Sequence, residues 1–216
     1  RKETGALLER TTSLPTPHGL AFSPQQPYAI AADPGCERIT LLQPSADGIA
    51  VLARCEAPLG LSLSSPVWTI DGAHIVAANA RTASLSVYAV RAMPKNQSGV
   101  SIHLVGTSEP VTPIEALLAH PSEPGILTLR TEKQGCRVEF WALRGNELRI
   151  EQDAWIPHAA RSLAHHAGTL WLASEDRVIR MRCSDLHSHD LRSIDTWETP
   201  RSPAGVQANI TRSGSV

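Results

Sequence analysis

The stretch Pro17–Leu42 reads PHGLAFSPQQPYAIAADPGCERITLL and sets the pattern of the whole chain. After its opening phrase come two short, largely apolar runs, Tyr28–Ala32 and Arg38–Leu42. Proline, glycine and aspartate separate these runs, and a further turn at Asp47-Gly48 leads into Ile49–Leu52. Short apolar runs bounded by such turn-forming residues are typical of β-strands. The segment therefore predicts four strands joined by tight turns.

The same order of strands and turns returns roughly 46 residues further on, a spacing typical of repeat folds. The turn of this second copy is Asp71-Gly72. Its four strands are expected at Pro66–Thr69, His74–Asn79, Ser84–Tyr88 and Val100–Val105. The chain thus contains an internal repeat.

Two further copies follow with the same four-part order. The third is expected at Ala116–Pro121, Gly125–Leu129, Arg137–Trp141 and Glu147–Ile150. The fourth is expected at Arg161–His165, Leu170–Ala173 and Val178–Met181, with an outer strand near Asp190–Ile194. Helical periodicity is weak in all four copies, which favours an all-β protein.

Four strands per repeat, at about 46 to 50 residues per repeat, predict a β-propeller of four-stranded blades, about four of them in this chain. The second strands carry Ala31-Ala32 and Ala77-Ala78, small residues that suit a strand covered on both faces. The outer strand Ser101–Leu104 alternates polar and apolar residues, as expected where one face meets water. A β-sandwich with irregular strands also fits the number of strands, but the repeated turn chemistry favours the propeller.

We expect residues 1–216 to form a single β-propeller region with repeats at approximately 17–57, 64–107, 114–152 and 159–196. Residues 1–14 and 203–216 are expected to be partial strands of adjoining blades, or tails. The chain begins with Arg1 rather than Met, and we interpret it as a cut-down part of a larger propeller of the seven-bladed type. The alternative is that the two end segments complement each other and close a small ring.

The charge balance limits the kinds of partner. Lys and Arg number 20 and Asp and Glu 21, for a net charge of -1. A near-neutral chain lacks the basic character that nucleic acids or anionic membranes attract. No apolar run approaches the roughly 20 residues that span a bilayer. We therefore expect neither a nucleic-acid nor a membrane partner.

The cysteines give no recognisable site. They are Cys36, Cys55, Cys136 and Cys183, and their spacing fits neither a zinc ribbon nor a redox CxxC pair. Four unpaired thiols packed in or near sheets are favoured over two disulfides. The sequence leaves the compartment open, with the cytoplasm slightly favoured.

Histidines give no metal site either. Adjacent residues of a strand point to opposite faces, so His165 and His166 cannot easily share one ion. The segment with His187 and His189 is polar and is interpreted as a surface turn. We expect no metal and no cofactor.

The segment Pro17–Leu42 resembles the lactonase-family β-propellers of the 6-phosphogluconolactonase and carboxymuconate cyclase type. The resemblance rests on the Pro-His pair that opens the repeat and on the Asp-x-Gly turn before the strand that begins Arg38-Ile39. Trp68–Tyr88 is similar to the following blade of that family, and the likeness covers Pro15–Val90. It implies a propeller fold and, by analogy, hydrolysis of a sugar lactone.

That family places a histidine, an arginine and a glutamate at the mouth of the central channel. His18 matches the histidine and would be the catalytic residue. Ser64 stands at the arginine position and Ala80 at the glutamate position, although Arg81 is adjacent. Two of the three groups are thus replaced, which predicts weak or absent hydrolase activity.

Four other residues are candidates to bind the substrate. Asp33, Asn79 and Arg81 lie near the position of His18 in the resemblance and would bind an anionic substrate or a sugar lactone. The five tryptophans are expected to pack between blades: Trp68, Trp141, Trp155, Trp171 and Trp197. Trp68 is also a candidate for binding, because it stands where the first strand of its blade nears the channel.

Two hypotheses of different class follow. In the first, the chain is a lactonase-like propeller that hydrolyses a sugar lactone such as 6-phosphogluconolactone. In the second, it is a non-catalytic propeller scaffold that binds a protein or a small ligand, since the fold alone does not fix the function.

Overall fold

The computed structural model describes residues 19–33, 37–46, 48–56, 63–79, 83–92, 99–109, 114–183, 186 and 195–198. These residues form sixteen strands in four antiparallel sheets, and they contain no α-helix. Each sheet consists of four strands consecutive in the chain, ordered from first to fourth across the sheet. We name them sheets 1 to 4 in chain order.

The strand bounds are as follows. Sheet 1 contains β1 (Gly19–Phe22), β2 (Ala29–Asp33), β3 (Arg38–Ser45) and β4 (Gly48–Glu56). Sheet 2 contains β5 (Leu63–Trp68), β6 (His74–Asn79), β7 (Ser84–Ala92) and β8 (Val100–Thr107). Sheet 3 contains β9 (Ile114–Ala119), β10 (Gly125–Glu132), β11 (Gly135–Arg144) and β12 (Glu147–Ile156). Sheet 4 contains β13 (Ser162–His166), β14 (Thr169–Ala173), β15 (Arg177–Arg182) and β16 (Asp195–Glu198).

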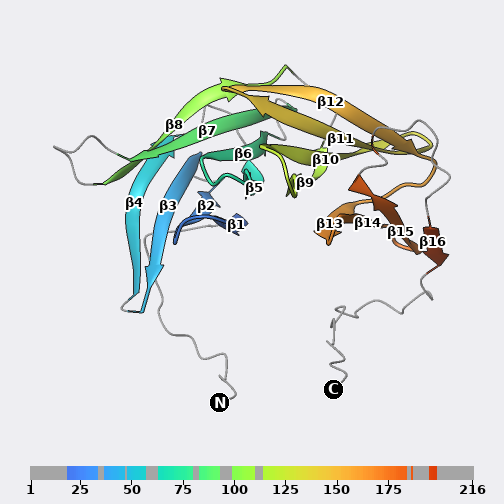
Figure 1. Cartoon of the computed structure of the whole chain (residues 1–216), viewed down its shortest axis with the longest axis horizontal. Coiled ribbons are helices and arrows are strands. Elements are labelled where there is room, and N and C mark those ends of the chain that lie inside the picture. The colour runs from blue at the N-terminus through green and yellow to red at the C-terminus, as the bar shows by residue number, and fades with distance from the viewer. Residues whose placement is uncertain are drawn as a thin grey trace, which may run out of the picture.

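The four sheets follow one another along an arc (Figure 1). The first strands of neighbouring sheets touch in turn, β1 with β5, β5 with β9, and β9 with β13, and they lie on the concave side. The outer strands β4, β8 and β12 lie on the convex side. This is the arrangement of propeller blades around an axis, and it confirms the predicted all-β, four-bladed propeller.

Apolar side chains fill the three interfaces between consecutive sheets. Residues 30, 32, 39 and 41 of sheet 1 pack against Trp68, Ile75, Ala77 and Tyr88 of sheet 2. The opposite face of sheet 2, with Val76 and Leu85, packs against Ile126 and Trp141 of sheet 3. The interface of sheets 3 and 4 joins residues such as Leu127 and Phe140 to Leu170 and Ile179. Since residues alternate between the two faces of a strand, each inner sheet contributes to two cores.

The grouping of the strands excludes the β-sandwich alternative. A sandwich distributes consecutive strands between two large sheets, whereas every sheet here is a single repeat. The end segments 1–14 and 203–216 and the outer strand expected at 190–194 lie outside the described residues. In the described part, the fourth strand of sheet 4 is Asp195–Glu198, which pairs with Arg177–Arg180.

Tryptophans were expected to pack between blades, and this is correct for only part of the set. Trp68 and Trp141 are buried at two different interfaces. Trp155 is instead 39% exposed on the outer strand β12. The prediction failed there because the outermost strand of a blade has little neighbouring sheet to cover it.

Two kinds of loop lie on the same face of the arc. One kind joins each sheet to the next, and the other joins the second strand of a sheet to its third strand. We call this face the loop face. It is formed by the ends at which first and third strands begin and second and fourth strands end, as the register pairs Gly19 with Ala32 and Ser162 with Ala173. No helix among the described residues is long and apolar enough to cross a membrane.

Candidate functional site

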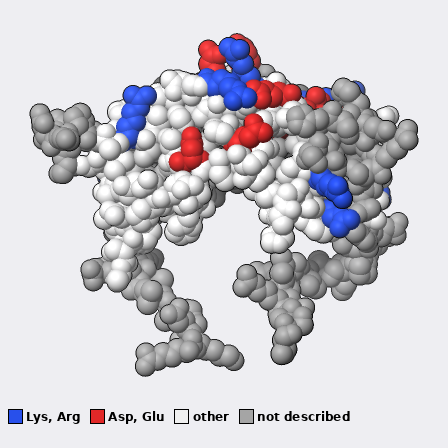
Figure 2. Space-filling view, viewed as in Figure 1, with Lys and Arg blue, Asp and Glu red and all other residues white. Residues whose placement is uncertain are grey.

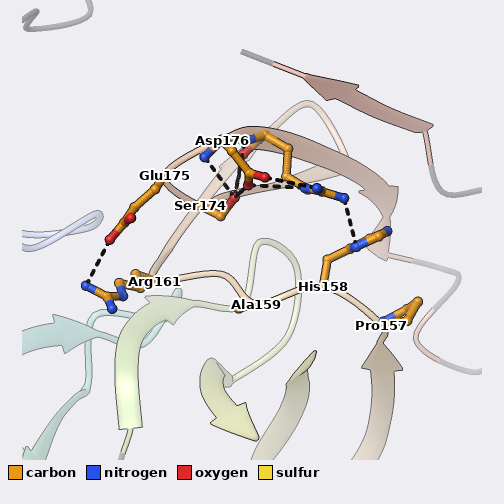
Figure 3. Close-up of a pocket in the computed structure, with 8 residues that line it drawn as sticks. Pro157, His158, Ala159, Arg161, Ser174, Glu175 and Asp176 are labelled. Atoms are coloured by element: carbon orange, nitrogen blue, oxygen red, sulfur yellow. Dashed lines mark hydrogen bonds and ion pairs between the residues drawn. The ribbon is translucent and has the colours of Figure 1, made fainter. Parts of the chain in front are cut away.

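A pocket of about 840 Å³ opens on the loop face beside sheet 4 (Figure 3). One wall is the connection between sheets 3 and 4 and contributes Pro157, His158, Ala159 and Arg161. The other wall is the β14–β15 turn, which contributes Ser174, Glu175, Asp176 and Arg177. Two segments about fifteen residues apart therefore supply one pocket, because β13 and β14 fold back as a hairpin between them.

The β14–β15 turn is held by its own serine. The Ser174 hydroxyl accepts hydrogen bonds from the backbone N–H groups of Asp176, at 3.4 Å, and of Arg177, at 3.1 Å. The same hydroxyl donates to the Asp176 carboxylate at 2.8 Å. This local bonding of serine to nearby backbone is a common turn-forming arrangement. It also occupies the hydroxyl, which is therefore not placed as a nucleophile next to a base.

Arg177 links the two walls. Its Nε and Nη2 donate to the two oxygens of Asp176, at 3.2 and 2.9 Å. These bonds, followed by the one from Ser174, hold the pKa of Asp176 well below its usual range. The Nη1 of Arg177 lies 3.0 Å from Nδ1 of His158 on the opposite wall. A guanidinium can only donate, so Nδ1 of His158 is the acceptor of this hydrogen bond.

Arg161 and Glu175 form a more open pair across the pocket mouth. Their N···O distance is 3.5 Å, and their side chains are 75% and 84% exposed. Each arginine of the pocket thus faces a carboxylate, so the lining offers both donors and acceptors but no large excess of either charge. Such a lining can bind a polar ligand of mixed charge. Among the described lining residues we find no nucleophile activated by a base.

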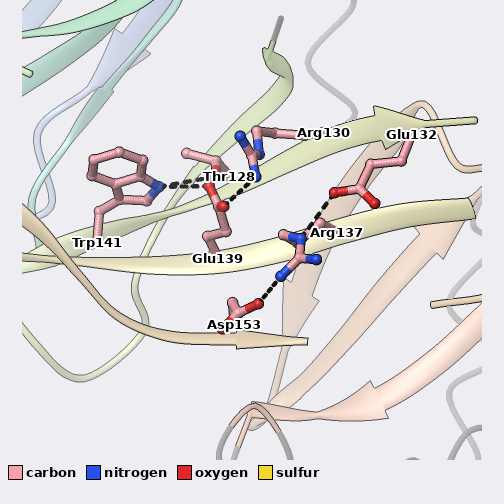
Figure 4. Close-up of polar contacts among 7 residues, drawn as sticks. All are labelled: Thr128, Arg130, Glu132, Arg137, Glu139, Trp141 and Asp153. Atoms are coloured by element: carbon pink, nitrogen blue, oxygen red, sulfur yellow. Dashed lines mark hydrogen bonds and ion pairs between the residues drawn. The ribbon is translucent and has the colours of Figure 1, made fainter. Parts of the chain in front are cut away.

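A second charged cluster lies inside the molecule, between sheets 2 and 3 (Figure 4). Glu139 of β11 is buried and lies 2.6 Å from the Nη2 of Arg130 on β10. Its Oε2 also accepts hydrogen bonds from the Trp141 indole, at 3.1 Å, and the Thr128 hydroxyl, at 3.2 Å. A buried carboxylate with three donors is well compensated. None of these four side chains lines the pocket of sheet 4, and we interpret the cluster as structural.

The same sheet carries a half-exposed ion-pair network nearer the loop face. Arg137 of β11 donates to Glu132, at 2.9 Å, and to Asp153 of β12 (Figure 4). The hydrogen bond with Glu132 contributes most to raising the pKa of Arg137 above its usual value. These contacts tie three neighbouring strands of sheet 3 together where the strands meet the loops.

Four of the five residues predicted from the sequence stand next to strand ends of the loop face. His18 directly precedes β1 and Arg81 follows β6, and both lie outside the described residues. Asp33 ends β2 and Asn79 ends β6, but their side chains are outside the described part of the chain. The strand ends next to all four positions belong to the loop face. Their catalytic and binding roles stay predictions.

Trp68 is the remaining predicted residue, and its side chain is described. It is 3% exposed within the interface of sheets 1 and 2. Its indole N–H donates to the Ala21 carbonyl at 3.2 Å. Trp68 therefore packs one sheet on the next, and a role in binding a ligand stays a prediction.

The pocket residues of sheet 4 were missed by the sequence analysis. In the sequence, one wall of the pocket is visible only as four polar residues, Ser174–Arg177, between two apolar strands. Such a segment is typical of an ordinary turn and does not by itself indicate a pocket. The other wall, with His158 and Arg161, is adjacent only in the folded chain. Spacing in the sequence could not have joined the two segments.

His120 directly follows β9, and His165 lies on β13, the neighbouring first strand of sheet 4. The His120 ring lies 4.2 Å from the Phe140 ring, and its Nδ1 accepts the backbone N–H of Glu123 at 3.1 Å. Burial lowers the pKa of His120 below its ordinary value, and burial likewise lowers that of His165. Both rings are thus neutral packing groups at neutral pH.

Comparison with solved structures supports the fold. A Bacteroides uniformis protein provisionally assigned as a 6-phosphogluconolactonase matches at a TM-score of 0.59 and 12% identity, over 77% of this chain and 50% of its own. Sqt1 from Saccharomyces cerevisiae matches at 0.57 and 13%, over 78% of this chain and 45% of its own. The WD40 domain of SCAP from fission yeast matches at 0.56 and 14%, over 86% of this chain and 43% of its own.

The chain spans about half the length of these solved structures. No family model matches it, and no curated protein does. At such low identity the likeness shows the propeller fold alone.

Proposed function

We propose that this chain is a non-catalytic propeller scaffold that binds a partner protein at the loop face. The observation that carries the proposal is the lining of the sheet 4 pocket. Its charged groups are Arg161 and Arg177, paired with Glu175 and Asp176, on a turn and a connecting segment. Small-molecule pockets are mainly apolar with a few polar groups, whereas the rims of protein interfaces are polar and often use arginine.

The backbone of the loop face supports the same proposal. Glu37 and Ala83 stand immediately before β3 and β7, at equivalent places in sheets 1 and 2. Both have positive φ, of 48° and 50°. Residues other than glycine adopt this conformation at a cost of order 1 kcal/mol or more, and such strain is concentrated at functional loops. Two of the three such residues in the described part of the chain thus lie on the loop face, which is the side on which we expect a partner. The third, Ala167, lies in the β13–β14 turn on the opposite face.

The test is binding to an immobilised array of acidic, basic and zwitterionic peptides, compared between the wild-type chain and the Arg161→Ala/Arg177→Ala variant. The matched control is Arg144→Ala/Arg149→Ala, which removes two arginines on the outer strands of sheet 3 that also pair with carboxylates. We expect at least about a tenfold loss of binding only in the pocket variant, as for a loss of 1.4 kcal/mol. Peptides that bind both variants equally, or an absence of any binding peptide, would contradict the proposal.

A second candidate function is hydrolysis of a sugar lactone such as 6-phosphogluconolactone. Supporting it is the topology, since the strand ends next to His18, Asp33, Asn79 and Arg81 belong to one face. His18 would orient water, and the other three would bind an anionic substrate. The test is the release of acid from 6-phosphogluconolactone. If the wild-type chain hydrolyses the lactone and His18→Ala abolishes this activity, the result supports the lactonase function. If the wild-type chain shows no hydrolysis, or if His18→Ala leaves the rate unchanged, this second function is excluded.

A further inference from the structure

A pocket of about 260 Å³ lies between sheets 1 and 2, on the face of the arc opposite the loop face. Two of its walls are turns, the β1–β2 turn with Gln26 and Tyr28 and the β5–β6 turn with Asp71. The remaining wall is formed by the end of β7 and the start of β8. We call it the hairpin pocket. It shares no residue with the pocket of sheet 4, so its role is independent of the function proposed above.

The two turns of the hairpin pocket hold each other in place. The Gln25 side chain donates a hydrogen bond from Nε2 to the Ile70 carbonyl at 3.1 Å. Gly72 has a φ of 66°, and a Cβ added to it would lie only 2.9 Å from Cβ of Gln25. Glycine is thus needed both for the backbone conformation and for the close approach of the two turns. The walls are therefore fixed in advance, which lowers the cost of ordering them around a ligand.

The wall from β7 and β8 is apolar. Val90 and Val100, like Tyr28 opposite them, pack against the core between sheets 1 and 2. Ala92 pairs with Val100 and lies on the same face of β7 as Val90. Arg91 stands between them in the sequence and therefore belongs to the other face of the strand. A hydrocarbon chain can thus lie along this wall without meeting a charge.

Asp71 is the only charged residue among the described lining residues of the hairpin pocket. Its Oδ1 is engaged within the turn, where it accepts hydrogen bonds from the Thr69 hydroxyl and, at 3.0 Å, from the Ala73 N–H. Its Oδ2 lies 4.0 Å from Nδ1 of His74, which is too far for a hydrogen bond. On the side seen in Figure 2, the surface over sheets 1 and 2 carries few charged side chains, which gather instead near β12. Oδ2 of Asp71 is therefore available to a donor from outside the chain.

We propose that the hairpin pocket binds a primary ammonium group carried on a short, unbranched apolar chain. This is the chemistry of a lysine side chain and of a free alkylamine. The apolar wall from β7 and β8 contacts the chain, and Oδ2 of Asp71 accepts a hydrogen bond from the ammonium group. Tyr28 and Gln26 have side-chain oxygens that can accept the remaining ammonium hydrogens.

The size of the pocket and the bonding of Asp71 favour an ammonium over other groups. A volume of about 260 Å³ is below the roughly 300–1,000 Å³ of sites for drug-sized ligands, so it suits a group the size of one side chain. A guanidinium binds a carboxylate best through two parallel hydrogen bonds, and Oδ1 of Asp71 is already engaged by Thr69 and Ala73. An ammonium is a compact charge and needs only the one oxygen that is available.

The primary experiment is a titration of the isotope-labelled chain with butylammonium, followed through the amide signals of Ala73 and Val100 in NMR spectra. Butanol is the neutral probe of the same length, and butylguanidinium tests the preference for an ammonium. We expect butylammonium to give saturable shifts of both signals. Butanol should bind at least about tenfold more weakly, because it lacks the charge-assisted hydrogen bond to Asp71. Butylguanidinium should also bind more weakly than butylammonium.

Three variants locate the binding in the hairpin pocket. Asp71→Asn keeps an oxygen for the hydrogen bonds of the turn but removes the charge, and it should weaken binding at least about tenfold. The matched control is Glu123→Gln, which removes a carboxylate from the equivalent β9–β10 turn of sheet 3 and should leave binding unchanged. Ala92→Phe fills the apolar wall without touching the carboxylate and should also abolish binding. Ala92 is exposed, so the fold should tolerate the larger side chain, and circular dichroism verifies this for every variant.

A short peptide with blocked ends and one lysine between glycines distinguishes the two sources of the ammonium. Peptide binding at least as tight as that of butylammonium identifies a lysine of a partner protein, and binding of butylammonium alone identifies a free alkylamine. The proposal is overturned if neither probe gives saturable shifts, or if butanol or butylguanidinium binds as tightly as butylammonium. It is also overturned if Asp71→Asn or Ala92→Phe leaves binding intact, or if Glu123→Gln weakens binding as much as Asp71→Asn does.

Discussion

Two arginine–carboxylate pairs in this chain have the same chemistry and opposite surroundings. Arg130 and Glu139 lie between sheets 2 and 3, with side chains 15% and 3% exposed and an N···O distance of 2.6 Å. Arg161 and Glu175 lie at the mouth of the sheet 4 pocket, with side chains 75% and 84% exposed and a distance of 3.5 Å. Burial, rather than residue type, separates a structural pair from one that a partner can reach.

The difference follows from the cost of removing charge from water. A buried ion pair is stable only when hydrogen bonds compensate for the lost hydration of its charges. Glu139 meets this condition, because Thr128 and Trp141 also donate hydrogen bonds to its carboxylate. An exposed pair keeps much of its hydration and contributes little to stability. The pocket pair can therefore exchange its partner for a ligand group at small cost, whereas the buried pair cannot.

The strongest test of the difference between the buried and the exposed pair is the substitution Glu139→Ala. It should lower the free energy of unfolding by about 3–5 kcal/mol, since Arg130 is left inside the interface without its carboxylate. Urea denaturation monitored by circular dichroism measures it. The matched control is Glu175→Ala, which should change stability by less than about 1 kcal/mol. Equal effects of the two substitutions would remove the distinction.

A smaller effect is expected from Trp141→Phe, which keeps the apolar ring but removes the indole N–H. That N–H donates to both Glu139 and Thr128. The loss should be about 1–2 kcal/mol, as for a buried hydrogen bond to a charged group. The same substitution in a Glu139→Leu background should cost less, because the charged acceptor is already absent. A cost that is the same in both backgrounds would show that Trp141 acts through packing alone.

A fall in pH is expected to lower the free energy of unfolding through His120, at the interface of sheets 3 and 4. Burial lowers the pKa of His120 below its ordinary value of 6.5, so the folded chain holds the ring neutral. Below pH 6.5 the unfolded chain binds the proton more readily, and stability is therefore lost as the pH falls from 6.5 toward the lowered pKa. Protonation at Nδ1 also removes the acceptor for the Glu123 N–H.

The measurement is the urea midpoint as a function of pH for the wild type and for His120→Asn. Asparagine can accept the same backbone hydrogen bonds but does not titrate. The variant should lose part of the pH dependence between pH 6.5 and 5, with the remainder due to groups such as His165. An unchanged slope would exclude His120 as its source.

The smallest effect is expected at the pocket. Arg161→Gln should change the free energy of unfolding by less than about 0.5 kcal/mol, because the pair with Glu175 is open to solvent. The same denaturation experiment measures it. A larger loss of stability would mean that the Arg161–Glu175 pair stabilises the fold, and it would contradict the interpretation that this pair is available to a partner.

Much of the fold could be predicted because its signals are local. Turn residues and apolar runs located most of the strands within a few residues, since each strand needs only its own alternation and its own turns. Trp155 was misjudged because the burial of a residue on an outer strand depends on whether another sheet lies over it. The candidate site could be predicted only as a set of strand ends, and the pocket walls around Arg161 and Arg177 were not recognised.

The sequence by itself determined the repeat, the antiparallel strands and the all-β class, because turn chemistry and alternation act over a few residues. Only the tertiary structure decided which charges are enclosed and which are open, as for Glu139 and Glu175. It also decided how far two equivalent side chains are exposed. Phe22 and Trp68 end the first strands of sheets 1 and 2, and they are 66% and 3% exposed. The physical reason is that burial depends on the neighbouring sheet, and sheet 2 has a described sheet before it while sheet 1 does not.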